Sequence, residues 1–411
     1  MTKIYVVGVG MTPFGRHADK SVKDLTRAAV ADALADAGAT MSDVQSAFFA
    51  NTSQGALEGQ FMVGGQIALR AMGFESIPIT NVENACASGS TAFHLACAYL
   101  KAGMAEVTLA VGVDKLFHPD KSKVATVFDG AWDVHDVPNI VHTLMELGTG
   151  VEAPPDRLEP AGPRSVFMDV YAALAKSHMR RYGTTERQLA AVSAKNHRHS
   201  VFNARSQYQM DMSIDDVLAA RMISWPFTLP MCSPISDGAA AAILCTESAL
   251  ARFGSNRAIE VLSSVLCSGS DRSADEPEQH LCRTAALRAY EQAGLGPRDI
   301  GVAEVHDASA FAELVQTENL GFCEIGQGGW LAERGMTSLG GRIPVNPSGG
   351  LESKGHPIGA TGLGQIFELV GQLRGEAGRR QAAGARIALA ENGGGFHGIE
   401  EAAATITILA R

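Results

Sequence analysis

One cysteine of the seven in this chain is distinguished by its surroundings. Cys86 lies in the segment NVENACASGSTA, where small residues separate a predicted strand from a predicted helix. Small neighbours let a ligand approach the backbone, and Gly89 permits a tight turn. A helix N-terminus also directs amide dipoles at the sulfur, which lowers its pKa and favours the thiolate. We therefore expect Cys86 to be a nucleophile. The alternative is a buried structural thiol, which is how we interpret Cys97 in the following helix.

A histidine lies in a second specialised segment, NPSGGLESKGHPIGATG, at residues 346–362. Its five glycines and two prolines indicate a rigid loop whose backbone a ligand can approach closely. His356, held in this loop, could accept the Cys86 proton or donate a hydrogen bond to a developing oxyanion. The alternative is a turn histidine whose ring is satisfied by neighbouring groups.

Two further segments carry weaker signals. His306 and Asp307 follow a predicted strand in AEVHDASAFAEL, where His306 could be a second donor and Asp307 a helix N-cap. The run ENGGGFHG, at residues 391–398, ends the predicted strand Ile387–Ala390. Its consecutive glycines could turn a nest of N–H groups toward an oxyanion.

The elements that must position these residues alternate between apolar strands and alanine-rich helices. We predict strands at Ile4–Val9, Ala47–Asn51 and Val107–Val113, and a helix at Val22–Gly38 that ends at its glycine. Continuous apolar strands between helices are typical of sheets covered on both faces, so the fold class is α/β.

The pattern recurs in the second half of the chain. Residues 25–51 align with residues 281–307 at a constant offset of 256, without a gap and with 8 identities in 27 positions. The aligned segments share the helix-ending glycine, the spacing to an aspartate and the strand that follows. We infer two homologous halves.

A second correspondence relates the two candidate catalytic residues. An offset of 270 places the turn after Cys86 on the turn after His356, and each turn opens a long apolar helix. The matched pairs are Cys86 with His356, Gly89 with Gly359, Thr91 with Thr361, and the predicted helices Ser90–Ala102 and Thr361–Arg374. Pseudo-twofold packing of the halves would bring both turns to the centre of the molecule.

The stretch between the halves breaks the repeat. Residues 115–231 are rich in charge, Met, His and Pro, with predicted helices at Phe167–Tyr182 and Thr185–His197. We interpret them as a loop or lid domain inserted into the first half, after which Ser233–Leu244 returns to the sheet. The predicted N-terminal half is then 1–114 plus 232–255, and the C-terminal half is 256–411.

Charge and cysteine usage argue against several classes of protein. The net charge is −10 without basic runs, so we expect neither nucleic acid nor an anionic membrane as the main partner. Single cysteines without CxxC or Cys/His metal spacing predict no metal site and indicate a reducing compartment. His197 and His199 are two residues apart, so they do not share a helix face and are not expected to bind a metal.

No apolar run reaches the ~20 residues that span a bilayer, and no secretory signal is recognisable, so we expect a cytoplasmic protein.

A phosphorylated ligand needs only a local basic rim. Such a rim could come from residues that lie close together in the sequence, although a solvated helix face is an equal alternative. These residues are Arg180, Arg181, Lys195, Arg198 and Arg205.

With these segments placed, the sequence resembles the thiolase superfamily over essentially its whole length. It is most similar to the sterol-carrier-protein-type and bacterial lipid-transfer-type thiolases, which are acetyl-CoA acetyltransferase-like. The segments that carry the resemblance are ENACASGSTA, HDASAFAE, NPSGGLESKGHPIGATG, SDGAAAA and KNHRHSVFNARSQYQ. The resemblance implies a thiolase fold, in which duplicated αβα halves form a five-layer αβαβα sandwich with an inserted loop domain.

The resemblance also implies roles for residues. Cys86 would be the acylated nucleophile, and His356 would activate it and form a first oxyanion hole with His306. The N–H groups of Cys86 and Gly394 would form a second oxyanion hole. The insertion would bind coenzyme A as a substrate, with no permanently bound cofactor. Residues expected at the substrate or coenzyme A are His197, Arg205, Ser348, Gly349 and Asn392.

The family is typically dimeric through the nucleophile half, so the resemblance implies a homodimer. Several relatives work with a small zinc-binding OB-fold partner protein, so the resemblance also implies such a partner.

One departure concerns the carbon-acid step. Ordinary thiolases have a second cysteine where this chain has Asn392, and the sterol-carrier branch has one where this chain has Ala308. His306, His356, Glu313 or a loop residue could serve instead. A bulky or aryl-bearing substrate whose carbanion leaves easily would need less help.

We therefore expect a thiolase-type acyl-CoA C-acyltransferase that cleaves or forms an unusual 3-oxoacyl-CoA through Cys86. Three alternatives stay open. They are a coenzyme-A-independent C-acyltransferase acting on a phenolic acceptor, a thiolase-fold retro-aldolase, and a non-catalytic acyl-CoA- or lipid-binding subunit.

Overall fold

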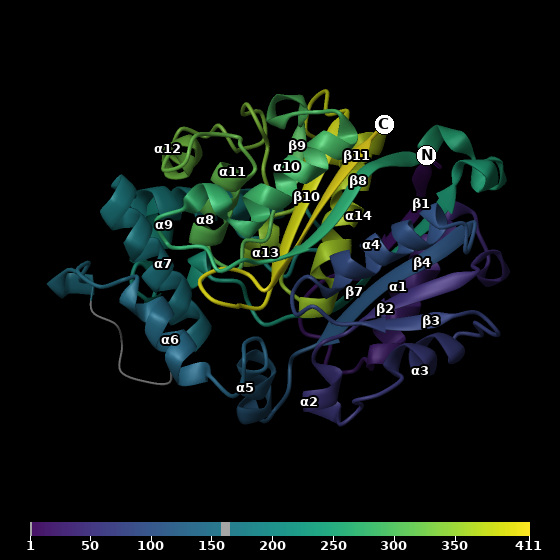
Figure 1. Cartoon of the computed structure of the whole chain (residues 1–411), viewed down its shortest axis with the longest axis horizontal. Helices are drawn as coiled ribbons and strands as arrows, with labels where there is room; N and C mark the ends of the chain where they lie inside the picture. Colours follow the sequence, from purple (N-terminus) through teal and green to yellow (C-terminus); the bar gives the residue numbers. More distant parts are fainter. Residues whose placement is uncertain (1, 158–164) are drawn as a thin grey trace.

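Nine strands form one mixed sheet in the order β3-β2-β4-β7-β1-β8-β11-β10-β9 in the computed structural model, which describes residues 2–157 and 165–411 (Figure 1). β1 and β8 are joined at only two paired positions, Tyr5 with Glu260 and Val6 with Ile259. The sheet therefore divides there into a five-stranded and a four-stranded part. The strands are β1 (Ile4–Met11), β2 (Ser46–Ala50), β3 (Ile79–Val82), β4 (Val107–Lys115), β7 (Asp237–Thr246), β8 (Ile259–Ser268), β9 (Val302–Glu304), β10 (Ile387–Gly394) and β11 (Ala403–Ala410).

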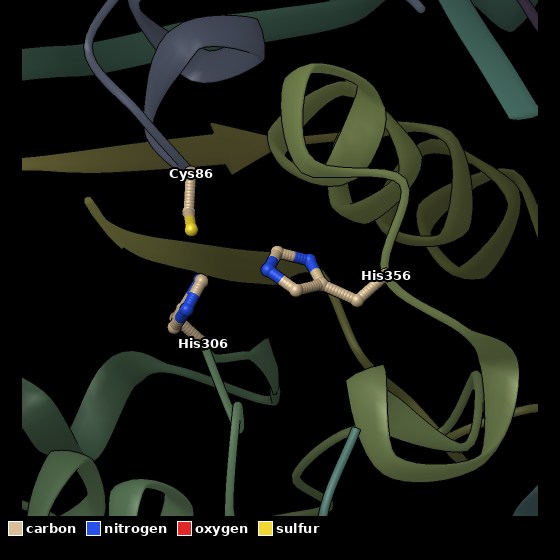
Figure 2. A group of neighbouring side chains, drawn as sticks. All are labelled: Cys86, His306 and His356. Atoms are coloured by element: carbon tan, nitrogen blue, oxygen red, sulfur yellow. The ribbon is translucent and has the colours of Figure 1, made fainter. Parts of the chain in front are cut away.

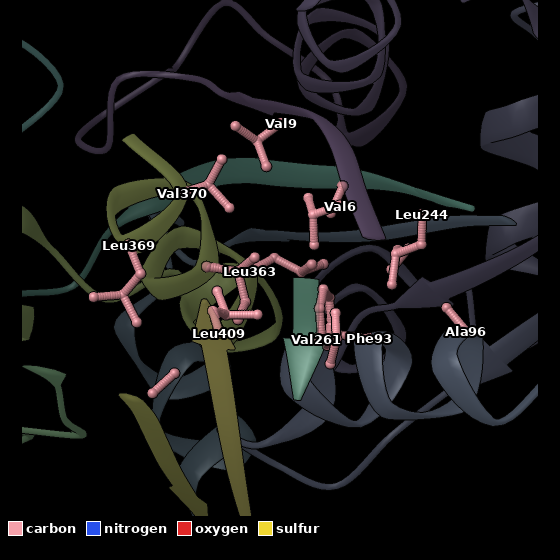
Figure 3. Close-up of a cluster of buried hydrophobic side chains, with 14 of the residues drawn as sticks. Val6, Val9, Phe93, Ala96, Leu244, Val261, Leu363, Leu369, Val370 and Leu409 are labelled. Atoms are coloured by element: carbon pink, nitrogen blue, oxygen red, sulfur yellow. The ribbon is translucent and has the colours of Figure 1, made fainter. Parts of the chain in front are cut away.

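Three layers of helices enclose the two parts of the sheet. Neighbouring residues of a strand point to opposite faces, so Val6 packs in the central cluster and Val7 on the outer face. The central cluster takes in α4 and α14, which contribute Phe93 and Leu363 (Figure 3). Helices α1 and α3 cover one outer face, and α10 covers the other. The fold is the predicted five-layer sandwich. These helices are α1 (Val22–Ala37), α3 (Gly64–Arg70), α4 (Ser88–Lys101), α10 (Leu281–Ala293) and α14 (Thr361–Arg374).

The predicted internal repeat is confirmed by matching local structures. Helices α1 and α10 each end at a glycine with a left-handed φ, 64° at Gly38 and 66° at Gly294. Glycine adopts this conformation without the steric penalty of a Cβ. The shared aspartate also has one role, since Asp43 and Asp299 each accept the backbone N–H three residues before them, at 2.9 and 2.8 Å.

The predicted insertion supplies the helices that lie away from both termini, namely α5, α6, α7 and α9 (Figure 1). The helices predicted at Phe167–Tyr182 and Thr185–His197 are α7 and α8, while residues 158–164 lie outside the described part of the chain. The domain boundaries themselves stay a prediction. The remaining α-helices are α2 (Gln54–Glu58), α5 (Lys121–Asp129), α6 (Val137–Glu146), α7 (Val166–Tyr182), α8 (Glu186–Ser200), α9 (Ile214–Ala219), α11 (Ala310–Asn319), α12 (Gly328–Glu333) and α13 (Gly350–Lys354), with a small hairpin of β5 (Met222–Ser224) and β6 (Phe227–Thr228). Among the described residues, no helix combines the length and apolar character needed to cross a membrane.

Candidate active site

Cys86 lies on a strained turn between β3 and α4. The preceding residue, Ala85, has a φ of 46°, in the left-handed region that non-glycine residues rarely occupy. The Ser88 hydroxyl holds this turn, since it accepts the Asn84 N–H at 2.8 Å and donates to the Ala85 carbonyl at 2.6 Å. Strain of this kind persists where the surroundings over-determine it, which is common at functional sites.

The turns of the two halves meet, as the offset of 270 predicts. A Cβ added to Gly89 would lie 2.6 Å from the carbonyl oxygen of Gly359, so the two turns contact each other backbone to backbone. A side chain at either matched glycine would push the halves apart. The paired glycines therefore bring the residues that open the turns, Cys86 and His356, to one place.

Thr361 fixes the tautomer of His356. Its Oγ1 lies 2.6 Å from the His356 Nδ1 and 3.0 Å from the Pro357 carbonyl oxygen. A hydroxyl has one proton, and the carbonyl can only accept it, so the hydroxyl accepts the Nδ1–H. The Nε2 of His356 is then unprotonated and can accept a proton.

His306 has the opposite tautomer. The Asn392 side-chain amide nitrogen lies 2.9 Å from its Nδ1. Because the amide nitrogen only donates, Nδ1 accepts, and the proton of the neutral ring is on Nε2. His306 can therefore donate a hydrogen bond. The Glu391 carboxylate accepts the His306 backbone N–H at 2.8 Å and holds the residue in place.

The two rings face the sulfur from different sides (Figure 2). The Cys86 sulfur and one nitrogen of each ring all lie within 4.8 Å of one another. The ring centroids of His306 and His356 are 5.2 Å apart with an interplanar angle of 84°. The arrangement can supply a nucleophile, a base and an oxyanion donor at one point.

The expectation that Cys86 is a thiolate is wrong. Burial, and then the negative charge of Asp114, raise the pKa of Cys86 to about 12, although hydrogen bonds from the Gly395 and Cys86 N–H groups act in the opposite direction. Burial lowers the pKa of His306 to about 4. Burial, and then the charges of His306 and Lys354, lower the pKa of His356 well below its usual range. All three groups are therefore neutral near pH 7, and Cys86 must lose its proton as it attacks.

Asp307 connects the loops of the two histidines. It is fully buried and accepts two backbone N–H groups at the start of α13, the helix that leads into His356. The expectation that Asp307 caps the helix after His306 is wrong, because Ser309 is the N-cap of α11. Asp307 therefore links the positions of the base and the donor.

The glycine run after Ala390 differs from the predicted nest. Strand β10 continues to Gly394, which pairs with Ala403 of β11. A Cβ on Gly394 would lie 3.0 Å from the Cys86 nitrogen, so the glycine permits close approach. The backbone N–H that reaches the Cys86 sulfur belongs to Gly395, which has a φ of 65°. The role expected of the Gly394 N–H, at the oxygen of a thioester, stays a prediction.

A cavity of about 730 Å³ opens onto Cys86, His306 and His356. Sequence analysis missed four titratable residues on its wall, which are Glu83, Tyr171, Cys232 and Glu401. Glu83 belongs to the nucleophile segment and could have been noticed there. The other three come from distant parts of the chain, and no local pattern marks them.

The five residues predicted to contact substrate or coenzyme A are not among the described residues that line this cavity. Each contacts other residues of the chain, and contact with substrate or coenzyme A stays a prediction for all five. The contacts are His197 with Pro230 and Ser353, Arg205 with Met11 and Asp32, Ser348 with Glu304, Gly349 packed on Ser200, and Asn392 with His306 and Ser90.

Among the described residues, two groups of side chains have the atom types of metal ligands. One is the trio of Cys86, His306 and His356, and the other is His280, Cys282 and Glu401. In the second group the His280 Nδ1 already accepts the Cys282 N–H at 3.2 Å, which leaves the ring proton on Nε2, facing Glu401. That tautomer disfavours metal binding. The absence of a metal site stays a prediction.

The combination of a half-buried cysteine, a neutral base and an oxyanion donor on an αβαβα fold defines an acyl-transferring enzyme. The chain belongs to the thiolase family, since residues 4–215 match the thiolase N-terminal domain and residues 269–411 match the thiolase C-terminal domain-like family. It is therefore an acyltransferase, and thiolases use coenzyme A as a substrate.

Relatives support this assignment over nearly the whole chain. The chain is 38% identical over 404 residues to an acetyl-CoA acetyltransferase of Methanothermobacter thermautotrophicus, covering 97% of this chain and 98% of that one. It is 38% identical over 403 residues to sterol carrier protein 2 of Homo sapiens, covering 95% and 70%. It is 34% identical over 377 residues to benzoylsuccinyl-CoA thiolase subunit BbsB of Thauera aromatica, covering 90% and 89%.

Solved structures show the same fold. The Ltp2-ChsH2(DUF35) aldolase has a TM-score of 0.77 at 21% identity, covering 99% of this chain and 97% of that one. Human mitochondrial 3-ketoacyl-CoA thiolase in complex with CoA has a TM-score of 0.68 at 16% identity, covering 100% and 98%.

Proposed function

We propose that the chain cleaves or forms a 3-oxoacyl-CoA through a thioester on Cys86. The observation that carries this proposal is the pair of opposed tautomers beside one sulfur. His356 has an unprotonated Nε2 and His306 has a protonated one. One nitrogen of each ring lies within 4.8 Å of the Cys86 sulfur. Addition of a thiol to a carbonyl needs a base for the proton and a donor for the oxyanion.

In the cleavage direction, Cys86 attacks the 3-oxo carbon while its proton passes to His356. His306 donates a hydrogen bond to the oxygen that becomes negative. Collapse of the adduct breaks the C2–C3 bond, leaves the acyl group on sulfur and releases an acyl-CoA enolate, which takes the proton from His356. Coenzyme A then attacks the thioester, with the N–H groups of Cys86 and Gly394 around its oxygen, and the bond from the acyl carbon to the Cys86 sulfur breaks as the second acyl-CoA leaves. The coenzyme A proton passes through His356 to the Cys86 sulfur.

His356 carries every proton transfer in this scheme. Ala308 and Asn392 offer no thiol. Glu313, which the sequence left open as a base, is buried in an ion pair with Lys195 at 2.8 Å and does not line the cavity. Glu313 is therefore withdrawn as a candidate base.

The wall of the cavity favours an aryl-bearing acyl group. Phe128 of α5, Phe167 and Tyr171 of α7, and Phe396 beyond β10 all line it. The Phe396 ring lies 5.7 Å from that of Phe167 and 5.5 Å from that of Tyr171, and Trp132 stacks on Phe167 at 4.4 Å. Clustered rings favour a flat apolar group through stacking and edge-to-face contacts. The name of the Thauera relative also points to an aryl substrate.

Acyl trapping tests the proposal. The protein is mixed with 3-oxo-3-phenylpropanoyl-CoA without free coenzyme A, quenched and digested, and the Cys86 peptide is examined by mass spectrometry. We expect a benzoyl group on Cys86, and a loss of turnover of roughly 10³-fold or more in Cys86→Ser. Cys97→Ser, in the helix α4 that follows the Cys86 turn, is the matched control and should still be acylated on Cys86. Full activity in Cys86→Ser would refute the proposal.

The alternatives make different demands on Cys86. A retro-aldolase needs no acyl-enzyme, so Cys86→Ala would still cleave a 3-hydroxyacyl-CoA. The solved aldolase structure is 21% identical to this chain and supports the fold alone. A phenol acylase would transfer the acyl group to a phenol without coenzyme A. A binding subunit would turn over nothing, with or without a partner.

A homodimer through the nucleophile half is part of the proposal. Strand β3 lies at an edge of the sheet, and beside it Phe61, Met62 and Val63 are 78%, 76% and 53% exposed. Unpaired strand edges and exposed apolar groups favour association. Light scattering should give the mass of a dimer, and Phe61→Asp with Met62→Asp should shift it toward the monomer. A monomeric wild-type protein would refute this part.

We also propose a small OB-fold partner and a reducing, cytoplasmic compartment. The structure whose title names a DUF35 component supports the first. Seven unpaired cysteines support the second. Copurification of a tagged chain with the product of a neighbouring gene tests the partner. Full activity without disulfide formation tests the reducing compartment.

A further inference from the structure

A tyrosine on the wall of the Cys86 cavity has a hydroxyl that the mechanism does not use. Tyr171 lies on α7, its side chain is 9% exposed, and its ring packs edge-on against Phe396 at 5.5 Å. Its hydroxyl forms no hydrogen bond with the residues that the structure describes. Buried tyrosine hydroxyls usually have a partner. A ligand in the cavity could provide it.

Tyr171 lies where the Cys86 cavity meets a second cavity. Tyr171, Phe396 and Glu401 line both the main cavity and a neighbouring one of about 120 Å³, so they form the wall between the two. The negative charge of Glu401 bears on the Tyr171 hydroxyl. An aryl group attached to the Cys86 sulfur and packed against Phe396 would bring its substituents to this wall.

The electrostatics of the wall select the kind of substituent. No lysine or arginine is among the described residues that line the cavity. Two glutamates, Glu83 and Glu401, do line it. Burial, and then the negative charge of Glu401, hold the pKa of Tyr171 well above its usual range, so its hydroxyl stays protonated and can donate. A carboxylate substituent would face Glu401 without a counter-ion. A neutral oxygen would gain a hydrogen bond.

We propose that Tyr171 forms a subsite that recognises a neutral oxygen on the acyl group, such as a ring hydroxyl or methoxy substituent. This inference rests on the proposed function and names the substrate class of the same site. The enzyme would then prefer oxygenated aryl acyl groups over unsubstituted ones, and both over aryl groups that carry a carboxylate.

The test measures kcat/KM for 3-aryl-3-oxopropanoyl-CoA substrates whose ring carries hydrogen, hydroxyl, methoxy or carboxylate at the meta or para position. We expect the wild-type protein to prefer the best hydroxyl or methoxy substrate over the unsubstituted one by about tenfold or more, because the substrate satisfies a buried group. In Tyr171→Phe this ratio should fall to about one. Tyr290→Phe is the matched control, since Tyr290 is also buried but its hydroxyl donates to the Leu320 carbonyl at 2.9 Å, outside the cavity.

The outcomes separate this inference from the proposed function. If every substrate acylates Cys86 but Tyr171→Phe keeps the wild-type ratio, the subsite is wrong and the function stands. A carboxylate substrate that is preferred by the wild-type protein would also overturn the subsite. If no substrate acylates Cys86, both proposals fail. An equal fall of the ratio in Tyr290→Phe would assign the effect to general loosening and overturn the subsite.

Discussion

The hydrogen bond from His356 to Thr361 decides whether the base can act, and Thr361→Val isolates it. Valine has nearly the shape of threonine but no hydroxyl, and the site is fully buried, with Thr361 1% exposed. The His356 Nδ1–H, which lies 2.6 Å from the Thr361 oxygen, would lose its acceptor. Leaving a buried donor unsatisfied costs about 1–3 kcal/mol. The ring would then favour the other tautomer, whose Nε2 carries the proton and cannot accept another.

The expected magnitude follows from that cost. Since about 1.4 kcal/mol corresponds to a factor of ten, the rate of Cys86 acylation should fall roughly 5–150-fold in Thr361→Val. Rapid-quench measurement of acyl-enzyme formation at saturating substrate reports this step directly. Thr361→Ser keeps the hydroxyl and should recover most of the rate. Thermal unfolding of both variants shows whether stability alone explains the loss. A wild-type acylation rate in Thr361→Val, or an equal loss in Thr361→Ser, would refute the tautomer argument.

Three further predictions test the charges and the missing thiol. Because burial raises the pKa of Cys86 to about 12, its alkylation by iodoacetamide should rise about tenfold per pH unit from pH 7 to pH 10, and a plateau near pH 7 would contradict the neutral thiol. His306→Ala removes an oxyanion donor and should lower kcat by about 10²–10³-fold in steady-state assays, while an unchanged kcat would remove His306 from the mechanism. Ala308→Cys places a thiol on the cavity wall and should raise kcat/KM for a straight-chain 3-oxoacyl-CoA by up to about 10²-fold, and no increase would mean that the second thiol is dispensable.

The positions of the catalytic residues could be predicted because local sequence encodes them. The glycines after Cys86 and His356 specify two equivalent turns, and their identity in the two halves shows that the turns are related by the duplication. The contact between Gly89 and Gly359 is the structural form of that relation. The turn before α4 and the turn before α14 contact each other through these glycines, so the meeting of Cys86 and His356 follows from the duplication.

The charge state of Cys86 could not be predicted in the same way. The sequence displays the helix N-terminus, but the N–H groups that lower the thiol pKa are those of Gly395 and of Cys86 itself. It does not display the burial of the sulfur or the nearby Asp114 on β4, and these two effects outweigh the amides. Desolvation depends on how elements pack, and no local pattern reports it.

Residues that contact a ligand were the least predictable part of the site. Ser348, Asn392 and His197 lie in segments that look specialised, but their polar groups are used to hold loops together. The cavity wall instead takes Tyr171 from α7 and Glu401 from the turn before β11, which are 230 residues apart in the sequence. Side chains that meet through tertiary packing leave no signal in spacing.

The low pKa of His356 leads to one more expectation about the step that lacks a second thiol. As an imidazolium, His356 is a strong acid in its buried position, so it can protonate the released enolate rapidly. By the same reasoning, neutral His356 is a weak base toward the C2 hydrogens of the product acyl-CoA. The exchange of these hydrogens with deuterated solvent can be measured by mass spectrometry while Cys86 carries its acyl group. This exchange should be slower than thiolysis of the same acyl-enzyme. Exchange faster than thiolysis would mean that another group on the cavity wall removes the proton, and Cys232 and Glu401 would then be the residues to substitute.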